Sequence, residues 1–133
     1  MTITAGTSIS IINSIVNGSG TITIGSGTAT SFSWNLVSGT VEASSGNGYI
    51  PNSGALVTFT LPVAPSVGDT MIILGYLGSW TISLSGGQQI QMGGLAATTS
   101  VSSTVNNDAI EIVCVDPSGI FVVLDSEGNF LLI

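Results

Sequence analysis

The sequence predicts an all-β fold, and three observations support this. Short runs of Ile, Val, Thr and Leu alternate between apolar and polar residues, as expected of strands that bury one face. Glycine, serine and asparagine separate these runs, and no segment sustains the period of roughly 3.6 residues that marks a helix. Short strands at regular spacing are typical of a sandwich, a jelly roll or a prism-like unit. We therefore expect a compact oligomeric unit of short antiparallel strands.

The N-terminal thirty residues differ from the rest of the chain. Thr-, Ser- and Ile-rich runs at 2–4, 8–12 and 21–24 are separated by Gly-Ser-Gly at 18–20 and 25–27, without any aromatic or charged residue. Such a segment has little material for a core of its own. We set a boundary near Ser31 and predict that residues 1–30 form a β arm that pairs within the assembly. The predicted contact residues of the arm are Ile3, Ile9, Ile11, Ile22 and Ile24.

Residues 31–133 are predicted to form the β domain. Four segments alternate with a period of two, and their apolar phases are Phe32, Trp34 and Leu36; Ala55, Val57, Phe59 and Leu61; Trp80, Ile82 and Leu84; and Ile110, Ile112 and Cys114. We expect these phases to face the core, which places both tryptophans inside. Segments 45–48, 85–87, 116–119 and 126–129 have the Gly, Asn, Asp and Ser content of turns. Cys114, the single cysteine, is predicted to be a small buried hydrophobe, because a reactive thiol is the rarer case.

The charge of the chain excludes several classes of function. The sequence contains no Lys, Arg or His, and its seven acidic residues give a formal net charge of -7. Affinity for nucleic acid comes from Lys and Arg, and anionic membranes need the same residues, so we expect neither partner. No apolar run approaches the ~18 residues of a membrane-spanning helix, so membrane insertion is not expected. Residues 1–4 also lack the basic and apolar regions of a Sec signal peptide.

Catalysis and metal binding have little support in the sequence. Histidine and lysine, which dominate acid–base and phosphoryl-transfer chemistry, are absent, so we predict a non-enzyme with no catalytic residues and no cofactor. A carboxylate pair remains conceivable, with Glu111 beside Asp108 or Asp125 beside Glu127, but solvated turn acids are the favoured interpretation. No metal site is predicted, and Asp125 and Glu127 are retained as weak cation candidates.

The edges of the predicted sheets favour self-assembly. Soluble β proteins often protect exposed edge strands with lysine, and this chain has none. Its mean hydropathy of +0.65 also leaves apolar surface that is most simply buried between subunits. We therefore expect a homo-oligomer, either a trimer or a filament. The absence of Lys and Arg leaves trypsin-like proteases no bond to cut, which suits an object outside the cell or on a virion.

An ordered set of short motifs resembles a known module. The set comprises Gly48-Tyr49-Ile50 followed by segments 56–62, 67–70, 78–82, 87–90, 107–114 and 128–129. From Trp34 to Ile133 the chain is similar to a β-rich module of bacteriophage tail-fibre-like proteins and related prophage-type proteins. The resemblance implies a homo-oligomeric module, often near the end of a fibre, without catalytic residues. It therefore implies a structural subunit of a fibre or filament.

A second hypothesis is a trimeric fibre-tip module that binds host surface glycans. Such sites stack sugars on exposed aromatic rings and bind their hydroxyl groups with amide side chains. Tyr49 and Tyr76 adjoin glycines, which favours exposure, and Gln88, Gln89 and Gln91 cluster nearby. These five residues are the candidate glycan contacts, although the glutamines could equally form a polar strand face or hydrogen bonds between subunits.

Overall fold

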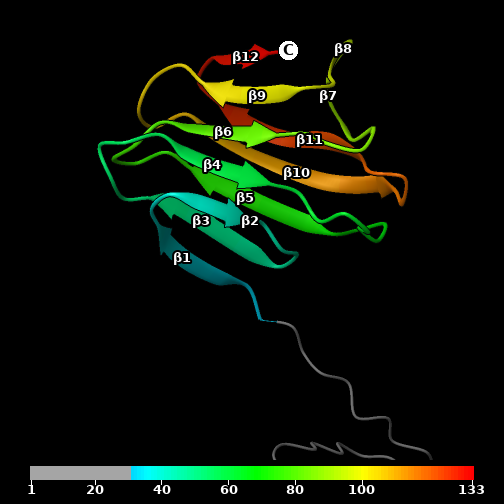
Figure 1. Ribbon diagram of the computed structural model, residues 1–133, viewed down its shortest axis with the longest axis horizontal. Helices are drawn as coiled ribbons and strands as arrows, with labels where there is room; N and C mark the ends of the chain where they lie inside the picture. The colour runs from blue at the N-terminus through cyan, green and yellow to red at the C-terminus, as the bar shows by residue number, and fades with distance from the viewer. Residues whose placement is uncertain (1–30) are drawn as a thin grey trace, which may run out of the picture.

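The computed structural model describes residues 31–133 (Figure 1). These residues form strands and no helix, which confirms the predicted all-β class. The predicted arm residues Ile3, Ile9, Ile11, Ile22 and Ile24 lie outside the described residues. The strands are β1 (Ser33–Val37), β2 (Thr40–Glu42), β3 (Asn47–Pro51), β4 (Val57–Thr60), β5 (Thr70–Leu74), β6 (Trp80–Ser83), β7 (Gln89–Met92), β8 (Leu95–Ala97), β9 (Ser100–Ser103), β10 (Ala109–Asp116), β11 (Ile120–Glu127) and β12 (Phe130–Leu132).

The strands form two mixed sheets that pack face to face. The seven-stranded sheet has the order β1-β3-β5-β10-β11-β7-β8, and the five-stranded sheet has the order β12-β9-β6-β4-β2. From β1 to β6 the chain changes sheet at every strand, and each strand lies parallel to the one two positions earlier. The first half of the domain is therefore a two-sheet coil. Beyond the coil, β10 pairs antiparallel with β5, and β9 pairs antiparallel with β6. The antiparallel pairings of β11 with β10 and of β12 with β9 extend the two sheets further.

The expectation of antiparallel strands is therefore wrong for half of the domain. Five of the ten strand pairings are parallel. Antiparallel neighbours follow from hairpins, whereas a chain that crosses to the opposite sheet after each strand returns in the same direction. The turn residues predicted at 116–119 do make a hairpin, between β10 and β11, in which Gly119 donates its N–H to the carbonyl of Asp116 over 3.0 Å.

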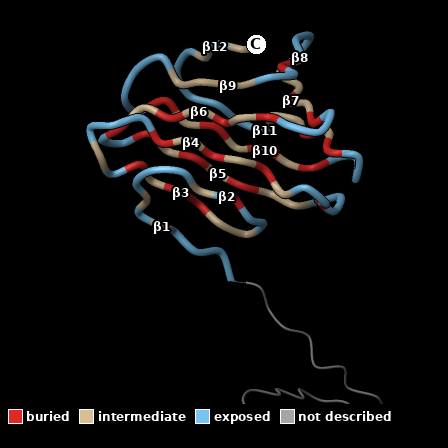
Figure 2. The backbone as a smooth tube through the Cα atoms, in the orientation of Figure 1, coloured by how far each residue is buried: buried red, intermediate tan, exposed pale blue. Residues whose placement is uncertain are grey.

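One hydrophobic core fills the space between the two sheets. The largest side chains with no exposed surface are Trp80, Phe59 and Phe121. Figure 2 shows buried segments of the central strands alternating with partly exposed ones, as a period of two requires. The predicted core phases of β4, β6 and β10 are confirmed, because Val57, Phe59, Leu61, Trp80, Ile82, Leu84, Ile110, Ile112 and Cys114 are all buried. Ala55 precedes β4 and is exposed.

Burial of apolar residues and backbone ladders carry this fold without help from ion pairs. The whole sequence lacks a cationic side chain, so no side-chain salt bridge can form. In the described residues no fully buried side-chain nitrogen or oxygen lacks a hydrogen-bond partner. Within the same region there is no helix of the length and hydropathy needed to cross a bilayer.

Candidate interaction surfaces

The coil has an open end at β1 and β2, which are the last strands of their sheets and lie at the same end of the molecule (Figure 1). In the described part of the chain, no strand pairs with the outer side of either one. Ser33 donates its N–H to Gly46 over 3.1 Å, and the carbonyl of Val37 accepts from Asn52 over 2.9 Å, so these residues face β3. Backbone groups of alternate residues point to opposite sides of a strand. The N–H and C=O groups of Trp34 and Leu36 therefore point away from β3.

The edge of β2 repeats this arrangement. The carbonyl of Gly39 accepts from the Thr58 N–H over 3.2 Å, and Ala43 donates its N–H to Thr60 over 2.8 Å. The backbone groups of Thr40 and Glu42 consequently face away from β4. The open end thus presents two short strand edges, and Glu42 is the only charged residue on either strand.

An exposed apolar strip follows β1. Phe32, Trp34 and Leu36 are exposed to 45%, 52% and 69%, and the rings of Phe32 and Trp34 form an edge-to-face pair with centroids 5.3 Å apart. The indole of Trp34 lies over the bare backbone of Gly48, where an added Cβ would collide with it. The strip covers the outer face of the seven-stranded sheet, since the inward positions of β1 belong to Asn35 and Val37.

The prediction that Trp34 lies in the core is therefore wrong, as is the same expectation for Phe32 and Leu36. Trp80, by contrast, has no exposed surface and donates its Nε1–H to the carbonyl of Asp108 over 3.0 Å, as predicted for a core tryptophan. Both residues occupy the apolar phase of an alternation. They differ because β6 is central in its sheet whereas β1 is an edge strand whose apolar phase faces outward.

The five glycan candidates do not form one exposed surface. Tyr49 is 5% exposed and its hydroxyl accepts the Ser44 N–H over 2.8 Å, so the expectation that it is exposed is wrong. Gln88 is 4% exposed and donates its side-chain amide to the Pro62 carbonyl over 2.8 Å, which makes it a structural tie between loops. Tyr76 is exposed in the β5–β6 loop. Gln89 and Gln91 are partly buried on β7.

The carboxylates separate into one buried group and one exposed group. Asp108 is 1% exposed, and its Oδ2 accepts the N–H groups of Thr104 and Val105 over 2.8 and 3.1 Å. This role fixes a turn and leaves Asp108 no exposed surface from which to pair with Glu111. Glu111 instead lies directly opposite Asp125 across β10 and β11.

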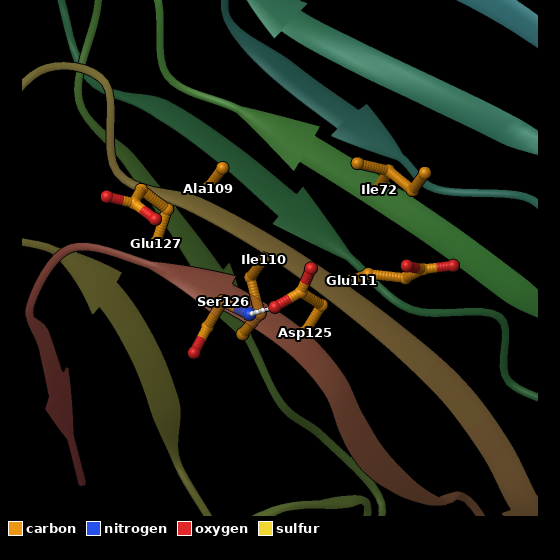
Figure 3. Close-up of a pocket in the computed structure, with 7 residues that line it drawn as sticks. All are labelled: Ile72, Ala109, Ile110, Glu111, Asp125, Ser126 and Glu127. Carbon is orange, nitrogen blue, oxygen red and sulfur yellow. Dashed lines mark hydrogen bonds between the residues drawn. The ribbon is translucent and has the colours of Figure 1, made fainter.

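Glu111, Asp125 and Glu127 line an open hollow of about 250 Å³ on the outer face of the seven-stranded sheet (Figure 3). Asp125 and Glu127, the weak cation candidates, thus share one face of β11. The carboxylates are spread along the strands in Figure 3 and do not converge on one point. Among residues 31–133, no cluster of three acidic, histidine or cysteine side chains has an arrangement that could hold a metal ion.

Two side chains near the β10–β11 turn have shifted pKa values. Burial raises the pKa of the Cys114 thiol, and the nearby carboxylates of Asp69 and Asp116 add to the shift, while the hydrogen bond to the Asp116 carbonyl opposes it. This agrees with the predicted inert, buried cysteine, which is 1% exposed. Hydrogen bonds from the side chain and the backbone N–H of Ser118 lower the pKa of Asp116, which stays ionised to lower pH.

Compared with known proteins, the chain matches no protein-family model and no curated protein.

Sequence reasoning missed two features of the surface. The outward orientation of Trp34 depends on the sheet order, which no local pattern encodes. The opposition of Glu111 and Asp125 depends on a bulge, because β11 advances by two residues between Asp125 and Val123 while β10 advances by one. The Asp-Pro-Ser-Gly turn could have indicated the hairpin but not this register.

Proposed function

We propose that this protein is a structural subunit of an extracellular fibre or filament of the phage tail-fibre-like kind. The subunits assemble by pairing strands and burying apolar surface between copies. The observation that carries the proposal is the open end of the coil, where two strand edges have no pairing partner within residues 31–133 and no lysine or arginine protects them. Unprotected strand edges are the sites at which β proteins add strands from another chain.

The exposed strip beside this edge supports the same proposal. Pairing along β1 would bring a neighbour against Phe32, Trp34 and Leu36, three large apolar side chains that water now contacts. Fully burying an exposed side chain of this size contributes roughly 1.5–3 kcal/mol, and about half of that is available here because the three side chains are already partly covered. This apolar contribution adds to that of the backbone hydrogen bonds. Repulsion between copies is small here, since Glu42 is the single charge on the two edge strands.

The glycan-binding alternative has less support. Of its five candidate residues, Tyr49 and Gln88 have their polar groups engaged in internal hydrogen bonds. Tyr76 lies in the β5–β6 loop, whereas Gln89 and Gln91 belong to β7. Of the five candidates only Tyr76 is exposed, which gives a sugar little of the predicted site to bind, so we propose a structural, non-enzymatic role.

Electron microscopy of the purified full chain tests the proposal, together with its mass in solution. We expect filaments or discrete oligomers, and a monomer at high concentration would contradict the proposal. Leu36→Lys places a cation on the β1 edge and is expected to abolish assembly. Leu95→Lys is the matched control, because Leu95 is 66% exposed on the β8 edge at the opposite end of the same sheet. It adds the same charge and should assemble normally.

Removing residues 1–30 tests the role of the predicted arm. If the arm of one copy pairs with the open end of another, the shortened chain should stay folded and lose assembly. Shortened protein that assembles like the full chain would show that β1 and β2 pair with something other than the arm, and would leave the Leu36→Lys result as the decisive measurement.

A further inference from the structure

The two-sheet coil implies where a strand that precedes β1 would lie. Along the coil each strand pairs in parallel with the strand two positions earlier, so β3 lies beside β1 and β4 beside β2. A strand that preceded β1 in the same coil would belong to the five-stranded sheet and would pair with the outer edge of β2. This is the edge to which the backbone groups of Thr40 and Glu42 point.

The apolar packing is incomplete beside β2. Val41 lies in one row with Phe59 of β4 and Ile82 of β6. Phe59 and Ile82 have no exposed surface, whereas Val41 packs on the same core and remains partly exposed. An apolar side chain from one further strand would cover the exposed part of Val41, and burial of this kind stabilises the strand that supplies it.

The outer face of the five-stranded sheet carries hydroxyl groups in register. One row crosses β2, β4, β6 and β9 and consists of Thr40, Thr58, Thr81 and Ser102. The hydroxyls of Thr81 and Ser102 are 2.8 Å apart and form a hydrogen bond. Threonine pairs on neighbouring strands stabilise a sheet. The strand that fits beside β2 therefore alternates Thr or Ser on the outer face with an apolar residue on the core face.

Residues 21–24, with the sequence Thr-Ile-Thr-Ile, have this alternation. It is the phase of β2 itself, in which Val41 stands between two polar residues. In the register that continues the pairing of β2 with β4, Ile22 lies beside Val41. Thr21 and Thr23 then lie on the outer face and extend its hydroxyl groups by one strand.

The connection from this segment to β1 also has a suitable length. Within the coil, residues 43–46 and 61–69 make the two connections from the five-stranded sheet to the seven-stranded sheet. Residues 25–32 would make the next one, and their number lies between those of the other two. Segment 8–12 has a similar alternation, but residues 13–32 separate it from β1, a longer stretch than any connection within the coil. Segment 21–24 of the same chain is therefore the better match for β2.

We propose that residues 21–24 pair in parallel with β2 of their own chain and close this edge of the five-stranded sheet. Ile22 packs on Val41 at the core, and Thr23 lies beside Glu42 on the outer face. The inference goes beyond the proposed function, because it assigns the edge of β2 to the subunit itself. Its consequence for assembly rests on the proposed function: β1 is then the edge at which copies meet.

Cross-linking of introduced cysteine pairs in the full chain with a short bis-maleimide tests this inference. Cys114 stays in place, because its thiol is buried. The variant Thr23→Cys, Glu42→Cys should form a cross-link within one chain, which denaturing mass spectrometry detects as the mass of one chain plus one reagent. The matched control is Ser10→Cys, Glu42→Cys, which places the first thiol in the similar segment 8–12. The first pair should react at least about tenfold faster, because strand pairing holds its thiols close together.

Two outcomes would overturn the inference. A rate for Thr23→Cys, Glu42→Cys that is no higher than in the control would mean that residues 21–24 have no fixed place beside β2. A cross-link of this pair that joins two copies would assign the edge of β2 to a neighbour. Circular dichroism of each variant verifies that the fold is retained.

Electron microscopy of the same variants separates this inference from the proposed function. A cross-link within one chain, without assembly, supports the inference and contradicts the proposed function. Assembly together with a cross-link between copies supports the proposed function and contradicts the inference.

Discussion

At the scale of single residues, Asp108 shows how this fold uses a carboxylate without a cationic partner. Its side chain accepts hydrogen bonds from the N–H groups of Thr104 and Val105, and its carbonyl accepts the indole N–H of Trp80. The residue thus connects the turn before β10 with the centre of the core. Gly128 packs so closely against this carboxylate that any side chain there would collide with it.

We predict that Asp108→Ala lowers the free energy of unfolding by about 2 kcal/mol, because it leaves the N–H groups of the turn without acceptors. Asp108→Asn retains one acceptor oxygen and should lose less. Urea denaturation measures both changes. Asp116→Ala is the control, as the exposed carboxylate of Asp116 binds only its own turn, and its effect should be much smaller than that of Asp108→Ala. Similar losses for Asp108→Ala and Asp116→Ala would contradict the structural role of Asp108.

The raised pKa of the Cys114 thiol leads to a prediction of how the stability of the fold responds to alkaline pH. Burial raises the pKa of its thiol in the folded state, so the folded protein holds this proton more tightly than the unfolded chain does. The contribution to stability is complete below the pKa of the unfolded thiol, about 8.5, and is lost as the pH rises through the folded value. Unfolding measured between about pH 7 and pH 11 should show a steeper fall in stability for the natural chain than for Cys114→Ala. Parallel curves would contradict the assignment.

At the scale of strands, the sequence predicted which segments form strands better than it predicted which face of each strand points to the core. The alternations around β4, β6 and β10 gave the correct core faces because these strands are covered on one side by the opposite sheet. Trp34 and Trp80 occupy similar local patterns, yet one is half exposed and the other fully buried. Only the sheet order distinguishes them. The order is determined by pairings between distant segments, such as β5 with β10, and a local pattern carries no information about those.

The packing of β1 on β3 depends on Gly48. The Trp34 and Phe32 rings occupy the space in which a Cβ at this position would lie. We predict that Gly48→Ala displaces the Trp34 indole into water and weakens assembly, while the core around Trp80 is preserved. Tryptophan fluorescence should shift to the red. Trp34→Phe is the control, since it removes that signal and should make the spectrum insensitive to Gly48→Ala. A spectrum that shifts in the control as well would mean that the Trp80 environment has changed.

At the scale of the whole molecule, the missing cations alter the usual balance of charge. Ordinary domains combine both signs, so the loss of carboxylate charge in acid leaves a strongly positive chain that repels itself. Here the same titration leaves only the α-amine charged, because the sequence has no Lys, Arg or His. Acid therefore removes the repulsion between copies and adds none within a copy.

This balance predicts that the folded domain tolerates acid but loses solubility there. Below the sequence pI of about 4.1 no positive charge replaces the lost negative charge, so light scattering should rise as the pH falls through this value and stay high at about pH 2.5. Near-ultraviolet circular dichroism of dilute protein should be preserved over the same range, since the core contains no histidine that must charge and no ion pair that must break. Asp116, whose pKa is lowered, contributes stability above the unfolded pKa that is lost as the pH falls through its folded value. Asp116→Asn should therefore flatten only the acid end of the stability curve. Protein that redissolves below about pH 3, or that loses its near-ultraviolet signal before it scatters light, would contradict the prediction.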